Sequence, residues 1–139
     1  MISIEAEAWQ AMVRHAEAGY PKECCGILLG KEQDGGRVVT LAVPCRNAYD
    51  GDQRDRFHLD PKDQLAADRK ARELGLTVLG FFHSHPDEEA YFSSTDLKYS
   101  WPWYSNVVLS VREGGVRYAK SFIANEDQTA SETEELHYG

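Results

Sequence analysis

The pattern of apolar and polar positions predicts alternating helices and strands. Apolar residues recur at helical spacing over residues 4–18, where Ser3 is the expected N-cap. They recur again from Asp60-Pro61, an N-cap followed by a proline in the first turn, to a C-terminal Gly75. Apolar runs bounded by turn residues predict strands instead. The expected strands are 24–30, 37–43, 57–59, 77–83, 106–111 and 116–123.

The order of these elements predicts the fold class. Glycine-containing turns at 34–36 and 113–115 would join neighbouring strands into antiparallel hairpins. The run 77–83 is almost continuously apolar, which is typical of a central strand covered on both faces. A ten-residue loop then leads to a short helix that begins near Ser93. We therefore expect a mixed α/β fold with one main sheet and two or three helices packed against it.

Composition and charge narrow the possible functions. The chain has 139 residues, 42% of them hydrophobic, and we expect residues 1–139 to form one domain. A formal net charge of −8 without a basic stripe argues against nucleic-acid binding. No apolar run approaches the roughly 20 residues that span a bilayer. Glu5 and Glu7 stand where a signal peptide would be basic, so we expect a soluble, cytoplasmic protein with no membrane partner.

The acidic residues are concentrated near the end of the chain. Residues 126–139 hold five of the 23 aspartates and glutamates and no lysine or arginine. This segment is predicted to be either a solvated acidic tail or a final edge strand around residues 135–138. The net charge therefore says little about a functional site elsewhere.

The three cysteines, Cys24, Cys25 and Cys45, do not form a disulfide or zinc-ribbon pattern. Their number is odd, and no C-x-x-C spacing occurs. We expect them to be small buried residues of strands. Cys25 could instead face a nearby active site and contact a metal there.

The segment richest in chemistry is His-Ser-His-Pro at residues 83–86. Side chains alternate along a strand, so His83 and His85 would leave the central strand on the same face. Pro86 would then turn the chain outward. The chain returns at a helix N-terminus, where the helix dipole favours an ionised Asp96. A strand-end histidine or a capping aspartate can be purely structural, but two imidazoles and one carboxylate are also the ligand number of a catalytic zinc site.

A metal-activated water also requires a base. Glu23 is the best candidate because it leads into the buried strand predicted at 24–30. Its position alone leaves an exposed structural role equally open. Asp87, Glu88 and Glu89 lie beside the candidate ligands and are expected to face solvent or a substrate.

Taken together, these residues resemble the signature of the JAMM (MPN-plus) family, E…H-[ST]-H-P-x6-S-x-x-D. Glu23, residues 83–86, Ser93 and Asp96 match it, including the spacing from the second histidine to the aspartate. Residues 23–30 also resemble the first strand of that family, acid-x-x-Gly-aliphatic-Leu-x-Gly. The resemblance implies a cytidine-deaminase-like fold, a curved mixed β-sheet flanked by helices.

The resemblance also implies a zinc metallopeptidase. His83, His85 and Asp96 would bind one Zn²⁺ per chain. Glu23 would be the general base that passes a proton from water to the leaving nitrogen, and Ser93 would donate a hydrogen bond to the developing oxyanion. Ser84 receives no role.

The substrate implied is a peptide or isopeptide bond after the C-terminal Gly-Gly of a ubiquitin-like protein. The chain looks most similar to compact bacterial members that process sulfur-carrier proteins, because no long insertion follows residue 105. Residues 44–58 could form a short recognition loop, and an extended tail could dock by adding a strand to a sheet edge. The aromatic residues of 101–104 are expected to pack in the core. Nothing in the sequence predicts an oligomeric state.

Two other classes of protein remain as alternatives. A non-catalytic MPN scaffold would lack one or more of the five signature positions, and all five are present here. Amidohydrolases also use H-x-H, but their β/α barrel needs about 250 residues. The sequence therefore favours the enzyme over the scaffold.

Overall fold

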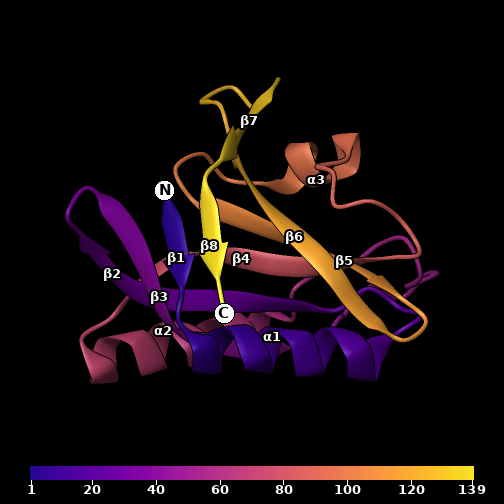
Figure 1. Ribbon diagram of the computed structural model, residues 1–139, viewed down its shortest axis with the longest axis horizontal. Helices are drawn as coiled ribbons and strands as arrows, with labels where there is room; N and C mark the ends of the chain where they lie inside the picture. Colours follow the sequence, from indigo (N-terminus) through magenta and orange to yellow (C-terminus); the bar gives the residue numbers. More distant parts are fainter.

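The computed structural model describes residues 1–139 as a curved eight-stranded sheet with three helices (Figure 1). This confirms the predicted α/β class. The elements are β1 (Ile2–Ile4), α1 (Ala6–Gly19), β2 (Cys25–Gln33), β3 (Gly36–Cys45), α2 (Pro61–Leu74), β4 (Thr77–Pro86), α3 (Ser94–Tyr99), β5 (Ser105–Arg112), β6 (Gly115–Ala124), β7 (Ser131–Glu134) and β8 (Leu136–Tyr138).

The two long helices cover opposite faces of the sheet. Met12 and other small or apolar residues of α1 pack with Leu28 and Phe82 in one core cluster. Ala67 and Ala71 of α2 pack with Ile27 and its neighbours in another. Adjacent residues of β2 thus enter different clusters, as expected for a strand buried on both faces. None of the helices is long and apolar enough to cross a membrane.

β4 lies in the middle of the sheet, as its apolar run predicts. The strand order is β7-β6-β5-β4-β2-β3-β1-β8, and β4 pairs antiparallel with β2 and parallel with β5. Pairing with β5 continues to Pro86, which lies opposite Val111. The strand is therefore longer than predicted, and it carries both histidines within its paired length.

The expected helix start at residue 4 is wrong. Ile2 and Ile4 are buried in β1, which runs parallel to both β3 and β8, and α1 begins only at Ala6 after Glu5. Ser3 is thus a strand residue and not an N-cap. The Ile-Ser-Ile alternation suits a strand, but both partners of that strand lie far away in the sequence.

The second helix follows its predicted signals closely. The Asp60 side chain accepts a hydrogen bond from the Lys62 N–H (2.9 Å), and Gly75 ends the helix with φ of 67°. The strand predicted at 57–59 is reduced to one isolated bridge between Asn47 and Leu59. The reason is local, since the Asn47 side chain binds main-chain groups on either side of Phe57.

The acidic C-terminal segment forms two edge strands and not a solvated tail. β7 pairs with β6 at one edge of the sheet, while β8 pairs with β1 at the other. Glu135 alone separates the two strands, and its carbonyl accepts the Ile2 N–H (2.9 Å). One short segment therefore completes both edges of the curved sheet (Figure 1).

Candidate metal and catalytic site

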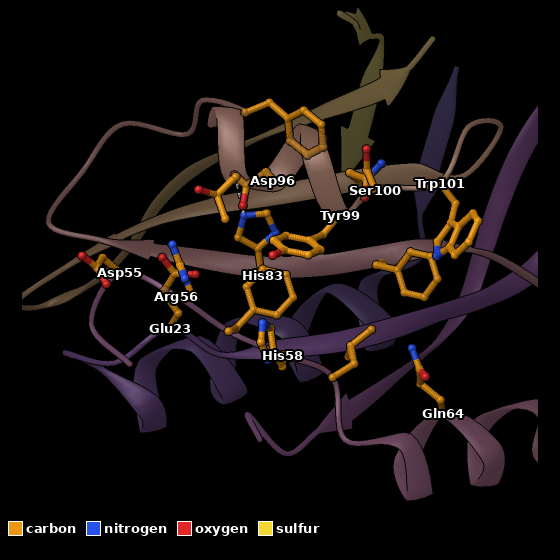
Figure 2. A pocket seen from close by; sticks show the side chains of 16 residues that line it. Glu23, Asp55, Arg56, His58, Gln64, His83, Asp96, Tyr99, Ser100 and Trp101 are labelled. Atoms are coloured by element: carbon orange, nitrogen blue, oxygen red, sulfur yellow. Dashed lines mark hydrogen bonds and ion pairs between the residues drawn. The ribbon is translucent and has the colours of Figure 1, made fainter. Parts of the chain in front are cut away.

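The structure brings three predicted ligands together at the C-terminal end of β4. His83 and His85 project from the same face of the strand, and the loop after Pro86 returns to place Asp96 in the first turn of α3. Figure 2 shows His83 and Asp96 side by side. The Nε2 atoms of the two histidines are 3.2 Å apart. Each of them is also 3.2 Å from Oδ2 of Asp96.

These distances fit a tetrahedral metal ion. Ligand atoms about 2.0–2.1 Å from a tetrahedral zinc lie roughly 3.3 Å from one another. The three atoms of His83, His85 and Asp96 form an equilateral triangle of nearly this size. The two imidazole nitrogens and the carboxylate oxygen can all act as hydrogen-bond acceptors, so they have too few protons to satisfy one another. A cation bound between them satisfies all three at once. The donor set therefore fits a divalent metal such as zinc.

Other contacts orient the two imidazoles. Nδ1 of His85 donates to the Glu89 carbonyl (3.1 Å), which leaves the Nε2 lone pair free for a metal. The ring of Tyr91 contacts His85 edge-on, with centroids 4.8 Å apart. His83 is stacked on Phe57, with centroids 4.6 Å apart and the planes inclined by 26°. One histidine is thus held mainly by a hydrogen bond and the other by an aromatic ring.

Ser93 and Asp96 form a capping box at the start of α3. The Ser93 hydroxyl accepts the Asp96 N–H (3.0 Å), and Asp96 Oδ2 accepts the Ser93 N–H (3.0 Å). Burial alone would raise the pKa of Asp96, but His83 and the hydrogen bond from the Ser93 N–H hold that pKa well below its usual range. Asp96 is therefore ionised, as a metal ligand must be.

Glu23 lies just before β2 and is buried, with 7% of its surface exposed. Its main chain is fixed, because its N–H donates to the Gln53 carbonyl (2.6 Å) and its carbonyl accepts from Asn47 (3.1 Å). Burial and, to a smaller extent, the nearby Asp96 raise the pKa of Glu23 to about 9. A cation held by Asp96 and the histidines would oppose both effects and favour the ionised carboxylate.

Cys25 is not part of this group. All three cysteines are free and buried, as predicted. The Cys25 thiol is directed at the carbonyl of Arg46 (3.6 Å) and packs in the cluster beneath α2. Only His83, His85 and Asp96 place potential ligand atoms within 4.8 Å of one another.

Two grooves meet at Glu23. The first, of about 200 Å³, is rich in aromatic side chains and also contains His83 and Asp96 (Figure 2). The second is polar and contains His85 and Ser93. Further lining residues of the first groove include Phe57, Leu59, Phe81, Phe92, Tyr99 and Trp101. Those of the second include Tyr49, Asp52, Asp55, Arg56, Glu88 and Tyr91.

The aromatic segment after α3 differs from its prediction. Trp101 and Trp103 are 66% and 44% exposed, so they do not pack in the core. Tyr104 alone is turned inward, against Phe81. The guanidinium of Arg37 lies 4.1 Å from the Trp103 ring and covers it from one side. Aromatic composition predicts a core role, but Trp101 lines the first groove, and Trp103 packs beneath Arg37.

The individual residues of the loop 46–60 could not be singled out from the sequence. This loop supplies much of both groove walls, including Asp55, Arg56 and Phe57. The loop has no periodic pattern of apolar residues that could predict which of its side chains line the grooves. The one available signal is Asn47, a residue type that binds nearby main-chain groups, and here it does so at Tyr49, Arg56 and His58.

Comparison with known proteins identifies the class. Residues 5–122 match the family described as prokaryotic homologs of the JAB domain. The chain therefore belongs to this family, among the JAMM/MPN proteins. This confirms the resemblance that the signature residues indicated.

Particular relatives have named activities. The chain is 32% identical over 114 residues to the desampylase of Haloferax volcanii, covering 78% of this chain and 80% of that protein. It is 33% identical over 115 residues to the CysO-cysteine peptidase of Mycobacterium tuberculosis, covering 81% and 75%. A solution structure of a protein from Desulfitobacterium hafniense superposes with a TM-score of 0.85 at 30% identity, over 100% of this chain and 93% of that one. The relatives support a hydrolase that cleaves peptide or isopeptide bonds.

Proposed function

We propose that this chain is a zinc-dependent peptidase or isopeptidase that cleaves after the C-terminal Gly-Gly of a ubiquitin-like or sulfur-carrier protein. The observation that carries the proposal is the triangle of ligand atoms from His83, His85 and Asp96, 3.2 Å on each side. The unpaired buried carboxylate of Glu23 faces the same grooves. The relatives named desampylase and CysO-cysteine peptidase support bond cleavage, and the JAMM resemblance supplies the substrate class.

In this proposal, His83, His85 and Asp96 hold one zinc ion. When bound, the zinc supplies a Lewis acid that polarises the scissile carbonyl and lowers the pKa of water to about 7. Glu23 accepts a proton from the attacking water at its carboxylate oxygen and delivers it to the leaving nitrogen. Burial raises the pKa of Glu23 and a cation held by the three ligands would lower it, and these opposed effects suit a carboxyl group that both accepts and releases a proton near neutral pH.

Ser93 is proposed to stabilise the negative charge that develops on the carbonyl oxygen. Its hydroxyl oxygen already accepts the Asp96 N–H, which leaves the hydroxyl proton free to be donated into the polar groove. Such a hydrogen bond becomes stronger as the oxyanion forms, so it lowers the barrier more than it tightens substrate binding.

The substrate tail is proposed to run along residues 55–57 and not along an edge of the main sheet. The sheet edges are β7 and β8, whereas the site lies at the end of the central β4. Phe57 makes no main-chain hydrogen bond within the chain, while the Arg56 carbonyl and the His58 N–H are bound to Asn47. An extended tail can therefore pair with Phe57, and the Phe57 ring stacked on His83 narrows the groove there, which favours glycine.

The test is cleavage of a defined substrate. Sulfur-carrier proteins with a C-terminal extension after Gly-Gly are incubated with the zinc-loaded protein and followed by mass spectrometry. We expect release of the extension after the second glycine, and no release from a matched carrier ending in Ala-Ala before the extension. A zinc-loaded protein that binds the carrier but never cleaves it would support the non-catalytic scaffold instead.

A further inference from the structure

The loop that follows β4 is fastened to the β5–β6 hairpin by two side chains. Ser110 of β5 and Tyr118 of β6 lie directly opposite each other in the sheet register. The Ser110 hydroxyl donates to the Glu88 carbonyl (2.6 Å). The Tyr118 hydroxyl accepts the Ala90 N–H (3.0 Å) and donates to the carboxylate of Glu89. The loop is thus held at three consecutive residues by one cross-strand pair.

Glu89, the middle one of these three loop residues, contacts the candidate metal ligand His85. The Glu89 carbonyl accepts the hydrogen bond from Nδ1 of His85 (3.1 Å). A carbonyl oxygen can only accept, so the proton of the neutral ring stays on Nδ1 and the lone pair stays on Nε2. That lone pair faces Asp96 Oδ2 at 3.2 Å. The position of one carbonyl therefore sets both the tautomer and the orientation of His85.

His83 does not depend on this arrangement. It is stacked on Phe57, and its Nδ1 makes no hydrogen bond within the chain. A disturbance of the hairpin contacts would therefore affect His85 first and leave His83 in place.

We propose that Tyr118, assisted by Ser110, is a positioning residue for the zinc ligand His85. By fixing Glu89 and Ala90 it holds the Glu89 carbonyl against Nδ1 of His85. The proposal rests on the proposed function, because it assigns His85 to the zinc site. It adds a residue outside the signature, on a strand that contributes nothing else to the metal group.

Tyr20 provides a matched control. Its hydroxyl donates to Asp87 Oδ1 (2.6 Å), in the same loop and through the same kind of tyrosine–carboxylate contact. It makes no contact that leads to a histidine. Tyr20→Phe and Tyr118→Phe each remove a single hydroxyl group that contacts the same loop, so a difference between the two variants is due to the contacts that lead to His85.

The first measurement is zinc affinity, by competition with a chromophoric chelator. Loss of a contact that orients a metal ligand commonly weakens binding by about 10- to 100-fold, and we expect this of Tyr118→Phe. Tyr20→Phe should stay within about twofold of the unsubstituted protein, and Ser110→Ala should fall between the two. Equal affinities of Tyr118→Phe and the unsubstituted protein would overturn the positioning role. A protein that binds no zinc at all before substitution would instead overturn the proposed function.

The second measurement separates positioning from general loss of structure. In ¹⁵N-labelled, zinc-loaded protein, the Nδ1 proton of His85 should exchange slowly with solvent because of its hydrogen bond. We expect it to exchange at least about tenfold faster in Tyr118→Phe and to be unchanged in Tyr20→Phe. A weakened zinc affinity with unchanged exchange at His85 would show that Tyr118 acts by another route. Affinities are compared at a temperature where metal-free samples of both variants are folded.

Discussion

The two ends of the β4–β5 pair each hold a buried polar cluster, and the clusters differ in how well they are satisfied. At the start of the pair, Ser105 donates to Glu134 (2.7 Å), which also accepts from Ser121 (2.8 Å). Arg37 donates to Ser105 (2.8 Å), and the amino group of Met1 lies 3.7 Å from Glu134. At the other end, the ligand atoms of His83, His85 and Asp96 face one another, and Glu23 has no partner.

The clusters also differ in charge. Glu134 is balanced by the N-terminal amino group and by the nearby Arg37, which reaches it through Ser105. Glu23 and Asp96 form no ion pair with any lysine or arginine. A buried polar cluster that satisfies itself stabilises the fold, whereas one whose imidazole nitrogens and carboxylate oxygen mainly face one another as acceptors gains from a bound cation. The balance of charge thus distinguishes the cluster at Glu134 from the cluster of Glu23, His83, His85 and Asp96, which we propose is functional.

The largest expected effect is the loss of a ligand from the functional cluster. His85→Ala removes one corner of the triangle, and two remaining protein ligands hold zinc poorly. Metal analysis of the purified protein should fall from about one zinc per chain to less than about a tenth, with loss of peptidase activity. His137→Ala, at an exposed histidine of β8, should keep its zinc. Full zinc content in His85→Ala would show that this residue is not a ligand.

The next largest effect is expected at Glu23, the proposed general base. Glu23→Gln keeps the shape of the side chain but cannot accept a proton, so kcat should fall by about 10²- to 10⁴-fold while zinc content stays the same. Glu88→Gln is the matched control, because Glu88 is another acidic residue that lines the same polar groove as Glu23. A large loss of kcat in Glu88→Gln, with Glu23→Gln active, would transfer the role to Glu88.

Much of the functional cluster was predictable because its signals are local. The two histidines share a face by strand alternation, and a buried run of residues places them on a central strand. The capping box of Ser93 and Asp96 is likewise a short-range pattern. The burial of Glu23 was not evident from spacing alone. Its place before the predicted strand 24–30 made it the best candidate, and the resemblance to the JAMM signature then implied its role as the base.

The structural cluster could not be predicted because its members are distant in the sequence. Arg37, Ser105 and Glu134 meet only after the sheet has brought both of its edges together. The strand β1 was missed for the same reason, since both of its partners are remote. Likewise, no local pattern connects Tyr118 with the loop that it holds. Polar contacts across a sheet depend on register, which the hydrophobic pattern does not fully specify.

A smaller effect is expected when the structural cluster loses its charge. The Glu134 side chain is only 6% exposed. In Glu134→Gln, the hydroxyl groups of Ser105 and Ser121 and the amino group of Met1 lose this ionised acceptor. The free energy of unfolding should fall by about 1–3 kcal/mol in urea denaturation. Glu132→Gln, an exposed position on the same strand, should change it by less than about 0.5 kcal/mol. Zinc content should be normal in both, and zinc loss in Glu134→Gln would mean that the two clusters are coupled.

The last effect is expected to have the opposite sign to that of Glu134→Gln. The pKa of Glu23 is raised by burial to about 9 in the metal-free protein, so the folded state favours the protonated form. Its stabilising contribution is complete below the unfolded-state pKa of about 4.5 and is lost as pH rises toward 9. Glutamine cannot ionise, so Glu23→Gln does not lose this stability as the pH rises. The metal-free variant should therefore unfold at a higher temperature than the metal-free unsubstituted protein at about pH 8, and the difference should shrink toward about pH 5.

The same substitution would thus act in opposite directions at the two ends of β4–β5, destabilising at Glu134 and stabilising at Glu23. Zinc should reverse the second result, because a cation beside Glu23 favours the ionised carboxylate that glutamine cannot provide. Thermal unfolding with and without added zinc measures this directly. If Glu23→Gln lowers the unfolding temperature of the metal-free protein at about pH 8, Glu23 is satisfied within the fold, and the distinction between the two clusters fails.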